Sequence, residues 1–318
     1  MDFTSHAPVM LEESVDLVLP ERALGSATTI VDATFGAGGH TKAILSRQPS
    51  GRVIALDADP AAFERAVELS SRYPGRLTAV HANFADLDEA LDELGVDGVD
   101  GILYDLGLSS IQLADAERGF SFAGDEPLDM RLDPTTGDPT AADLLNTLSE
   151  RQLADLIHGS GDERFARRIA RQIVTRRARS PLRKTSDLVA AILSALPRNA
   201  SRGKIHPATR TFQALRMAVN HDVERLERSL AAAARRLRPG ARAVVISYHS
   251  GEDRSVKRVF RRWEHDGLAN VITRKPMTPT VEETKANPRS RSAKLRAAER
   301  LSAETQSQPE IMEDRGWR

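Results

Sequence analysis

The sequence has no cysteine, few aromatic residues and no long apolar run. Without cysteine it can form neither a disulfide framework nor a thiolate metal site. Because Phe, Trp and Tyr make up only 4% of the 318 residues, the core must rest on Leu, Val, Ile and Ala. A membrane helix needs about 18 consecutive apolar residues, and an export signal needs a basic and then an apolar stretch. Neither occurs, so we expect a soluble, cytoplasmic protein.

Net charge is also absent, because 45 Lys and Arg residues balance 45 Asp and Glu residues. The two signs are nevertheless separated along the chain. Acids crowd residues 86–100, whereas residues 164–184 hold nine basic residues and no acid, and residues 254–300 are again rich in arginine and lysine. Such asymmetry indicates nucleic-acid binding. The alternative is that these arginines only lie on solvated helix faces.

The clearest local signal is a glycine-rich loop at 34–40, between an apolar run and a helix-compatible run. This order of strand, loop and helix is typical of the first unit of a nucleotide-binding α/β fold. The next apolar run, 52–56, ends at Asp57. An acid placed about 20 residues after the glycines can accept hydrogen bonds from ribose hydroxyls.

The loop does not fit the known phosphate-binding patterns. The dinucleotide pattern G-x-G-x-x-G would need a glycine where the sequence has Thr41, and no G-x-x-x-x-G-K-[ST] occurs. A glycine loop without a phosphate-binding lysine suits a ligand that has a ribose but no phosphate, such as S-adenosylmethionine. From the loop alone, a generic βαβ turn whose glycines serve only packing stays open.

Further apolar runs at 77–81, 99–104, 241–248 and 270–273 predict strands, and a helix is predicted over 208–236. Residues 115–202 have a helical pattern, and two strands still follow them. We therefore predict an α/β fold with an inserted all-helical domain. The sheet domain would comprise residues 1–114 and 206–304, the helical, substrate-recognising domain residues 115–205, and a disordered tail residues 305–318.

Six segments resemble a known family: 34–40, 105–112, 118–122, 127–131, 206–216 and 249–254. In the same order, and over about residues 6–299, they resemble the bacterial ribosomal RNA small subunit methyltransferase H family. Several of these motifs are long and unusual, for example D-L-G-L-S-S-I-Q from position 105 and H-P-A-T-R-T-F-Q-A-L-R from position 206.

The resemblance implies a class I, Rossmann-like, S-adenosylmethionine-dependent methyltransferase that acts on N4 of a cytidine in the decoding region of 16S ribosomal RNA. It implies 16S RNA within the 30S subunit as the partner and no membrane, and it leaves a homodimer open. Together with the loop pattern, it assigns cofactor contacts to Gly36, Gly38, Gly39, His40, Asp57, Phe84, Asp105 and Gln112.

Methyl transfer from a sulfonium is an in-line displacement, in which positioning supplies much of the rate. The N4 lone pair is conjugated into the cytosine ring, so an acceptor at N4–H would localise it. We predict Asp105 as this catalytic acceptor, with the backbone carbonyls of residues 106–108 as helpers. Other amino-methyltransferases carry D/N-P-P-Y/F here, whereas this chain has D-L-G-L. Phe120 and Phe122 are therefore candidates to stack on the base.

A cytidine in folded RNA must leave its stack to reach a buried methyl group. RNA outside the pocket would be held through phosphate contacts. We predict that Arg167, Arg168, Arg171 and the segment 289–294 make these contacts, and that Arg210 flanks the pocket.

No metal is predicted, because His249, Glu252 and Asp253 match no metal-ligand spacing. A carboxylate–arginine brace with Arg254 or Arg258 is the better interpretation. Two alternative functions stay open. One keeps the fold but acts on DNA cytosine or a small amine. The other is a non-catalytic protein of ribosome assembly that binds the cofactor and RNA.

Overall fold

The computed structural model of the chain describes residues 8–19, 27–197 and 206–302. The predicted disordered tail, 305–318, lies outside them. The chain packs into two compact units, which we describe separately. The sheet unit comprises Met1–Asp57, Ala62–Gly107 and Glu227–Arg318, and the helical unit comprises Ala58–Ala61 and Leu108–Leu226.

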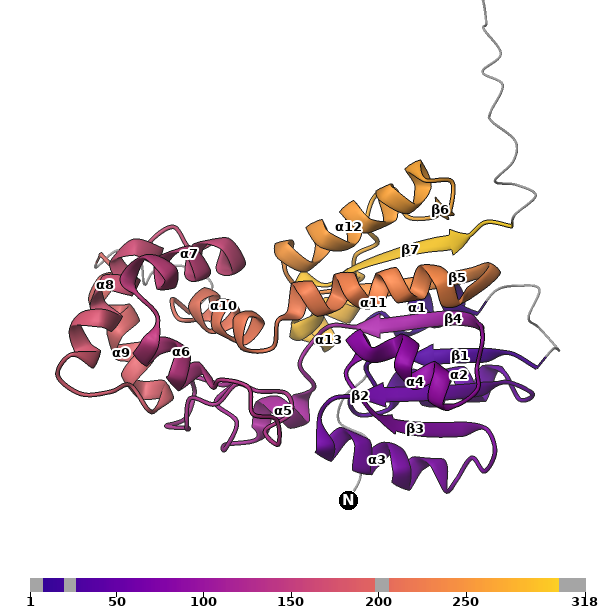
Figure 1. Ribbon diagram of the computed structural model, residues 1–318, viewed down its shortest axis with the longest axis horizontal. Coiled ribbons are helices and arrows are strands. Elements are labelled where there is room, and N and C mark those ends of the chain that lie inside the picture. Colours follow the sequence, from indigo (N-terminus) through magenta and orange to yellow (C-terminus); the bar gives the residue numbers. More distant parts are fainter. Residues whose placement is uncertain (1–7, 20–26, 198–205, 303–318) are drawn as a thin grey trace, which may run out of the picture. The chain divides into compact units, whose positions relative to one another are not determined.

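The sheet unit is built on seven strands in the order β3-β2-β1-β4-β5-β7-β6 (Figure 1). They are β1 (Thr29–Asp32), β2 (Arg52–Asp57), β3 (Leu77–His81), β4 (Val99–Asp105), β5 (Leu237–Ser247), β6 (Ala269–Val271) and β7 (Lys294–Arg300). β1 to β5 run parallel, and β7 is antiparallel to both of its neighbours. This is a doubly wound order with one reversed strand added, so the predicted α/β, Rossmann-like fold class is confirmed.

Consecutive residues of the parallel strands are buried, and their side chains point to opposite faces of the sheet. Helices therefore cover both faces. On one face, Leu103 packs with residues of α1, α2 and α3. On the other, the Tyr104 hydroxyl lies 2.9 Å from Ser229 Oγ on α11. The helices are α1 (Leu11–Val18), α2 (Gly39–Arg47), α3 (Pro60–Ser70), α4 (Leu87–Glu93), α11 (Asp222–Arg236), α12 (Ser250–His265) and α13 (Val281–Ala286).

Four neighbouring parallel strands end at the same edge of the sheet. β2, β1 and β4 end on acids, at Asp57, Asp32 and Asp105, and β5 ends at Ser247. Open α/β sheets bind their ligands outside the carboxyl ends of the strands. The sheet therefore collects three carboxylates at the edge where a ligand is expected.

Two sequence predictions about elements are wrong. The helix predicted over 208–236 is two helices, α10 (Thr209–Val219) and α11, separated at His221, whose φ is 50°. The strand predicted over 241–248 begins earlier, at Leu237, so the segment 238–240 lies inside β5. There the register with β4 shifts between Val99 and Gly101. A proline fits such a bulge because it needs no ladder hydrogen bond there.

The predicted RNA-binding segment at 289–294 is a 3₁₀ turn, Pro288–Ser292, followed by the first residue of β7. The sequence pattern missed β7 itself. β7 pairs with β5 along its length, with Arg242 opposite Glu299 at one end and Ser247 opposite Lys294 at the other. It thus lies in the sheet between the last parallel strand, β5, and β6.

The helical unit consists of short helices around their own apolar core (Figure 1). Thr140 and Ser149 each begin a helix with a capping box. The helices are α5 (Ser110–Ala114), α6 (Ala141–Thr147), α7 (Glu150–Gly161), α8 (Ala166–Arg177), α9 (Thr185–Ala195) and α10. None of the helices in the described ranges is long and apolar enough to span a membrane.

Candidate active site

The glycine loop turns sharply between β1 and α2. Gly36 and Gly38 have φ values of 54° and 76°, in the left-handed region where a side chain would be strained. The Gly38 N–H donates to the Phe35 carbonyl at 2.7 Å, which closes the turn. Gly39 begins α2, and a Cβ at this position would meet the Pro8 ring at 2.1 Å. Gly39 thus makes room for the segment before α1, whereas Gly36 and Gly38 shape the loop.

Asp57 joins the second strand to this loop. Its Oδ2 accepts a hydrogen bond from the Gly36 N–H at 2.8 Å. On α3, Arg65 Nε donates to the Gly36 carbonyl at 3.3 Å. The acid predicted to hold a ribose and the glycines predicted to surround it are therefore in direct contact. A tight loop with an acid at its rim fits a nucleoside ligand.

Asp105 lies within a cluster of polar side chains at the ends of β1, β4 and β5. Its backbone N–H donates to Thr34 Oγ1 at 2.6 Å. The Tyr248 hydroxyl donates to Asp105 Oδ1 at 2.7 Å, and His40 Nδ1 lies 3.9 Å from Oδ2. The Asp105 side chain keeps 22% of its surface exposed. It is thus fixed on one oxygen and still reachable.

Burial raises the pKa of Asp105, while His40, the Tyr248 hydroxyl and the Gly107 N–H oppose the rise and Asp32 adds to it. Burial likewise raises the pKa of Asp32, against His40 and a 2.6 Å hydrogen bond from Thr41. His40 Nε2 is buried, with no hydrogen-bond partner among the described residues. Raised carboxylate pKa values in a cleft are a property of functional sites.

Phe84 begins the turn after β3, where Asn83 Oδ1 accepts from the Ala85 N–H at 3.0 Å. Its half-buried ring meets Tyr104 edge-on, with ring centroids 6.1 Å apart. It therefore lies at the carboxyl end of the strand beside β2. A role as an aromatic contact for the cofactor stays a prediction.

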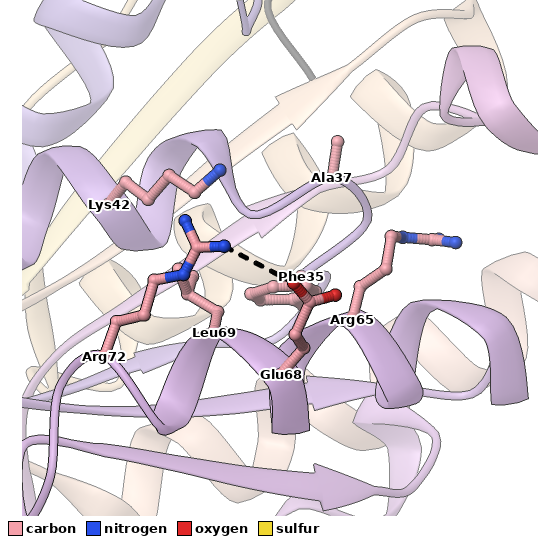
Figure 2. A pocket seen from close by; sticks show the side chains of 7 residues that line it. All are labelled: Phe35, Ala37, Lys42, Arg65, Glu68, Leu69 and Arg72. Atoms are coloured by element: carbon pink, nitrogen blue, oxygen red, sulfur yellow. Dashed lines mark hydrogen bonds and ion pairs between the residues drawn. The ribbon is translucent and has the colours of Figure 1, made fainter. Parts of the chain in front are cut away.

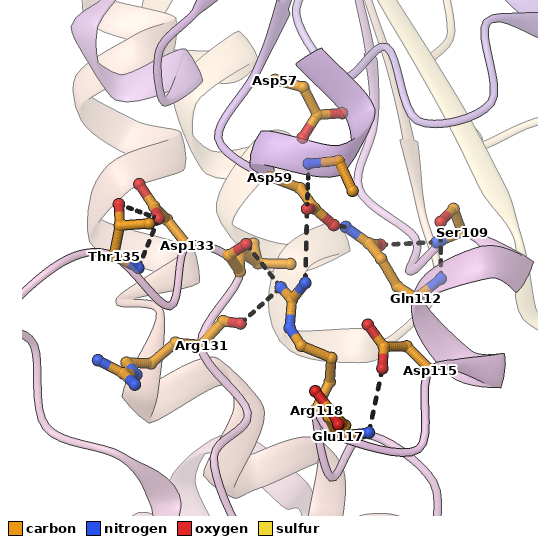
Figure 3. A network of polar contacts seen from close by, with 12 residues as sticks. Asp57, Asp59, Ser109, Gln112, Asp115, Glu117, Arg118, Arg131, Asp133 and Thr135 are labelled. Atoms are coloured by element: carbon orange, nitrogen blue, oxygen red, sulfur yellow. Dashed lines mark hydrogen bonds and ion pairs between the residues drawn. The ribbon is translucent and has the colours of Figure 1, made fainter. Parts of the chain in front are cut away.

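Gln112 belongs to a buried network of the helical unit (Figure 3). Its Nε2 donates to Asp59 Oδ2 at 2.8 Å, and its Oε1 accepts from the Ser109 N–H at 2.9 Å. Arg118 Nη1 approaches Asp59 Oδ1 at 3.4 Å, and its Nη2 donates to the carbonyls of residues 131 and 132. Gln112 thus binds Asp59 within the helical unit, and its predicted contact with the cofactor stays a prediction.

The two phenylalanines proposed to stack on a base differ in exposure. Phe120 is only 7% exposed, belongs to the core of the helical unit and lies under the Arg118 guanidinium. Phe122 is half-buried and stacks on His206 with centroids 4.6 Å apart. His206 Nδ1 accepts from the Ala208 N–H at 3.2 Å. Of the two rings, Phe122 is the more accessible.

The predicted RNA-binding arginines lie on exposed surface. Arg167, Arg168 and Arg171 project from α8, whose apolar residues pack into the core. Arg171 is 3.5 Å from Glu150, Arg168 lies over the Phe165 ring, and Arg167 has no ion pair among the described residues. Arg210 is exposed on α10. These positions suit phosphate contacts and equally suit solvation.

Asp253, after β5, serves as a brace with two basic residues of β7. Asp253 Oδ1 accepts from Arg296 at 2.7 Å, and its Oδ2 accepts from Lys294 at 3.2 Å. The prediction of a brace is thus confirmed, whereas the predicted partners Arg254 and Arg258 are wrong for Asp253. The sequence could not indicate the actual partners, Lys294 and Arg296, because its pattern does not reveal β7. No cluster of three potential metal ligands occurs among the described residues.

A small pocket lies beside α2 and α3 (Figure 2). Its lining comprises Phe35, Ala37, Lys42, Arg65, Glu68, Leu69 and Arg72. Its volume of about 30 Å³ matches one or two water molecules. Two residues of the glycine loop, Phe35 and Ala37, line this pocket, but none of the residues predicted to contact the cofactor does.

Comparison with known proteins gives one family. The model of the MraW methylase family matches residues 3–301. The ribosomal RNA small subunit methyltransferase H of Thermomicrobium roseum is 49% identical over 314 residues, 94% of each chain. The protein of the same name from Geobacter sulfurreducens is 47% identical over 93% of this chain and 99% of its own. Among solved structures, a rRNA methylase from Streptococcus thermophilus aligns over 93% of this chain and 99% of its own, with a TM-score of 0.44 and 10% identity.

Proposed function

The chain belongs to the MraW methylase family, and on that premise we propose that it methylates N4 of a cytidine in the decoding region of 16S ribosomal RNA. Its relatives at 44–49% identity are named ribosomal RNA small subunit methyltransferase H. The observation that carries the chemistry is Asp105, an accessible carboxylate at the end of β4 that is held by Tyr248 at 2.7 Å. The proposed substrate is the RNA within the 30S subunit, in the cytoplasm.

S-adenosylmethionine fits the site as the methyl donor. Gly36 and Gly38 shape a loop that a nucleoside can approach, and Asp57, at its rim, offers acceptors for ribose hydroxyls. Phe84 would contact the adenine. When bound, S-adenosylmethionine supplies a methyl carbon activated by a positively charged sulfur.

Asp105 acts on the amine. Its carboxylate accepts a hydrogen bond from N4–H, which directs the nitrogen lone pair out of conjugation with the ring. The lone pair forms the new N–C bond as the bond between carbon and sulfur breaks, and the electron pair of that bond remains on sulfur as a thioether. The surplus N4 proton passes to Asp105 and then to solvent. A positioned group of this kind typically contributes about 10²–10³-fold in rate.

The helical unit would hold the RNA. The cytidine leaves its stack at a cost of a few kcal/mol. Arg167, Arg168, Arg171 and Arg210 contact phosphates, and Phe122 stacks on the extruded base. Phosphate contacts of this type make affinity fall steeply with salt.

A direct test supplies purified enzyme and labelled S-adenosylmethionine with unmethylated 30S subunits, naked 16S RNA or duplex DNA. We expect label in 30S RNA, recovered after digestion as N4-methylcytidine. Label in DNA alone would favour a DNA cytosine methyltransferase. Binding of 30S and cofactor without any transfer would favour an assembly factor.

A further inference from the structure

Tyr248 is the first residue after β5 and faces the residues that follow β4. Its hydroxyl donates to Asp105 Oδ1 at 2.7 Å. Its ring lies against Gly107, where a Cβ would come within 2.6 Å of the ring carbon Cε2. The Tyr248 N–H donates to Glu252 Oε2 at 3.0 Å, which holds the backbone at this point. The phenol is therefore fixed at its ring, its backbone and its hydroxyl.

We infer that Tyr248 is the positioning residue of the reaction: its hydroxyl holds Asp105 Oδ1 and stabilises the ionised carboxylate, so that Oδ2 faces the target amine. This inference rests on the proposed function, in which Asp105 accepts the hydrogen bond from N4–H. His40 Nδ1 lies 3.9 Å from Oδ2, beyond hydrogen-bond distance, and the Asp105 side chain as a whole keeps 22% of its surface exposed.

The contact consists of two separable parts. The ring packs on Gly107, and phenylalanine would preserve that packing. The hydroxyl adds only the hydrogen bond to Asp105. Since a hydrogen bond to a charged acceptor is about twice as strong as one between neutral groups, the hydroxyl should act mainly on the protonation and direction of the carboxylate.

The charges around the pair support this assignment. Burial and Asp32 on β1 raise the pKa of Asp105, while His40 on α2, the Tyr248 hydroxyl and the Gly107 N–H oppose them. Burial, Asp105, Glu252 on α12 and Glu283 on α13 all raise the pKa of Tyr248 well above its ordinary value. Tyr248 therefore remains a protonated donor at the pH values where Asp105 titrates.

The test is the pH dependence of single-turnover methylation of 30S subunits at saturating cofactor, which isolates the chemical step from binding. In Tyr248→Phe, the Asp105 pKa should rise further. The rate grows as Asp105 ionises, so the midpoint of the acidic limb should move up by about 1 pH unit, the scale of one charge-assisted hydrogen bond. Cofactor affinity and the thermal midpoint should change little, because the ring remains.

Tyr104→Phe is the matched control. It also removes a buried tyrosine hydroxyl from the sheet unit, but that hydroxyl is next to Ser229 and not Asp105. We expect it to leave the pH profile unchanged. An equal shift in both variants would overturn the inference, because the effect would then not come from the contact with Asp105.

Asp105→Asn separates this inference from the proposed function. If Asp105→Asn is slow and Tyr248→Phe keeps the wild-type profile, Asp105 acts without Tyr248 and the inference is wrong. If Asp105→Asn reacts at a near-normal rate, the catalytic role of Asp105 fails and the inference fails with it. A slow Asp105→Asn together with a shifted Tyr248→Phe profile supports both.

Discussion

At the scale of single residues, Asp57 holds the glycine loop and is also the proposed acceptor for the ribose. Its Oδ2 holds the Gly36 N–H at 2.8 Å, so the carboxylate shapes the loop as well as facing the proposed ribose. Arg65 fixes the carbonyl of the same glycine. Removing Asp57 should therefore loosen the loop and remove the acceptors for the ribose.

We expect Asp57→Ala to weaken S-adenosylmethionine binding by about 1–3 kcal/mol, the scale of a lost hydrogen bond to a charged group. Asp57→Asn should lose less, because its amide oxygen can still accept from Gly36. Isothermal calorimetry measures both. Unchanged affinity in Asp57→Ala would remove this residue from the ribose site. Glu93→Ala, at an exposed acid that ends α4, is the control for a lost carboxylate.

The positions of the candidate site residues could be predicted where their signal in the sequence is local. The glycine loop, Asp57 and Asp105 each follow an apolar strand directly, so their place at the sheet edge could be predicted. Tyr248 could not be paired with Asp105, because their contact joins positions 143 residues apart and an unrelated helical block lies between them. The contact between Asp59 and Arg118 could not be predicted for the same reason, because 59 residues separate the two in sequence.

At the scale of elements, α8 offers a test of RNA binding. Ile169 and Ile173 are buried, while the opposite face presents arginines to solvent. Replacing Arg167, Arg168 and Arg171 by Ala should weaken RNA binding and flatten its salt dependence, because fewer counterions are released. Filter binding over a range of salt concentrations measures both quantities.

Arg151→Ala is the control for this experiment. Arg151 is 92% exposed on α7 of the same unit and is not among the arginines predicted to contact RNA. It should leave RNA affinity nearly unchanged, and cofactor affinity should be normal in all variants. If the triple variant keeps both its affinity and its salt slope, α8 is only a solvated face.

Asn220 holds the C-terminal end of α10 to the loop at residues 130–132. Its Nδ2 donates to the carbonyls of Met130 and Arg216, and its Oδ1 accepts from the Leu132 N–H, each at 2.8 Å. The side chain is only 3% exposed. Asn220→Ala would leave buried groups unpaired and should cost about 2–4 kcal/mol of the free energy of unfolding. Denaturant unfolding checks this, with the exposed Asn270→Ala as the control; equal stabilities would contradict it.

β5 illustrates why element boundaries could not be predicted. A Pro-Gly pair usually ends an element, and the strand predicted from the sequence begins only after this pair, at residue 241. In the structure, Pro239 and Gly240 lie in a bulge between two segments of β5 that both pair with β4. Pairing with β4 thus overrides the local preference of the Pro-Gly pair. The residue pattern of one strand does not show which strand it will pair with.

At the scale of the whole molecule, the net charge is zero although acidic and basic residues gather in separate segments, and some of these opposite charges pair in the fold. Acids of residues 86–100 pair with arginines that follow the helical block: Asp86 and Glu89 with Arg228, and Asp88 with Arg236. The acidic stretch is thereby largely neutralised within the sheet unit. The arginines of 164–184 have fewer acidic partners, which supports the sequence prediction of a nucleic-acid contact there.

The chain order of strands and the inserted helical block were predictable, because strands and helices have different periods in the sequence. The packing of the helical unit was not, since its short helices carry no signal of which one contacts which. Glycine at position 161 is an example: a Cβ there would meet the Arg210 carbonyl of α10 at 2.6 Å. The need for a glycine at this position becomes clear only from the close approach of α10.

The central claim is that this chain places a methyl group on N4 of one cytidine in the decoding region of 16S RNA and uses Asp105 to do so. Mass mapping of 16S RNA from a deletion strain, complemented with wild type or with Asp105→Asn, tests it most directly. We predict that the N4-methyl group disappears in the deletion strain, returns with wild type and stays absent or strongly reduced with Asp105→Asn. Persistence of the methyl group in the deletion strain would contradict the proposed function, and its full return with Asp105→Asn would contradict the mechanism.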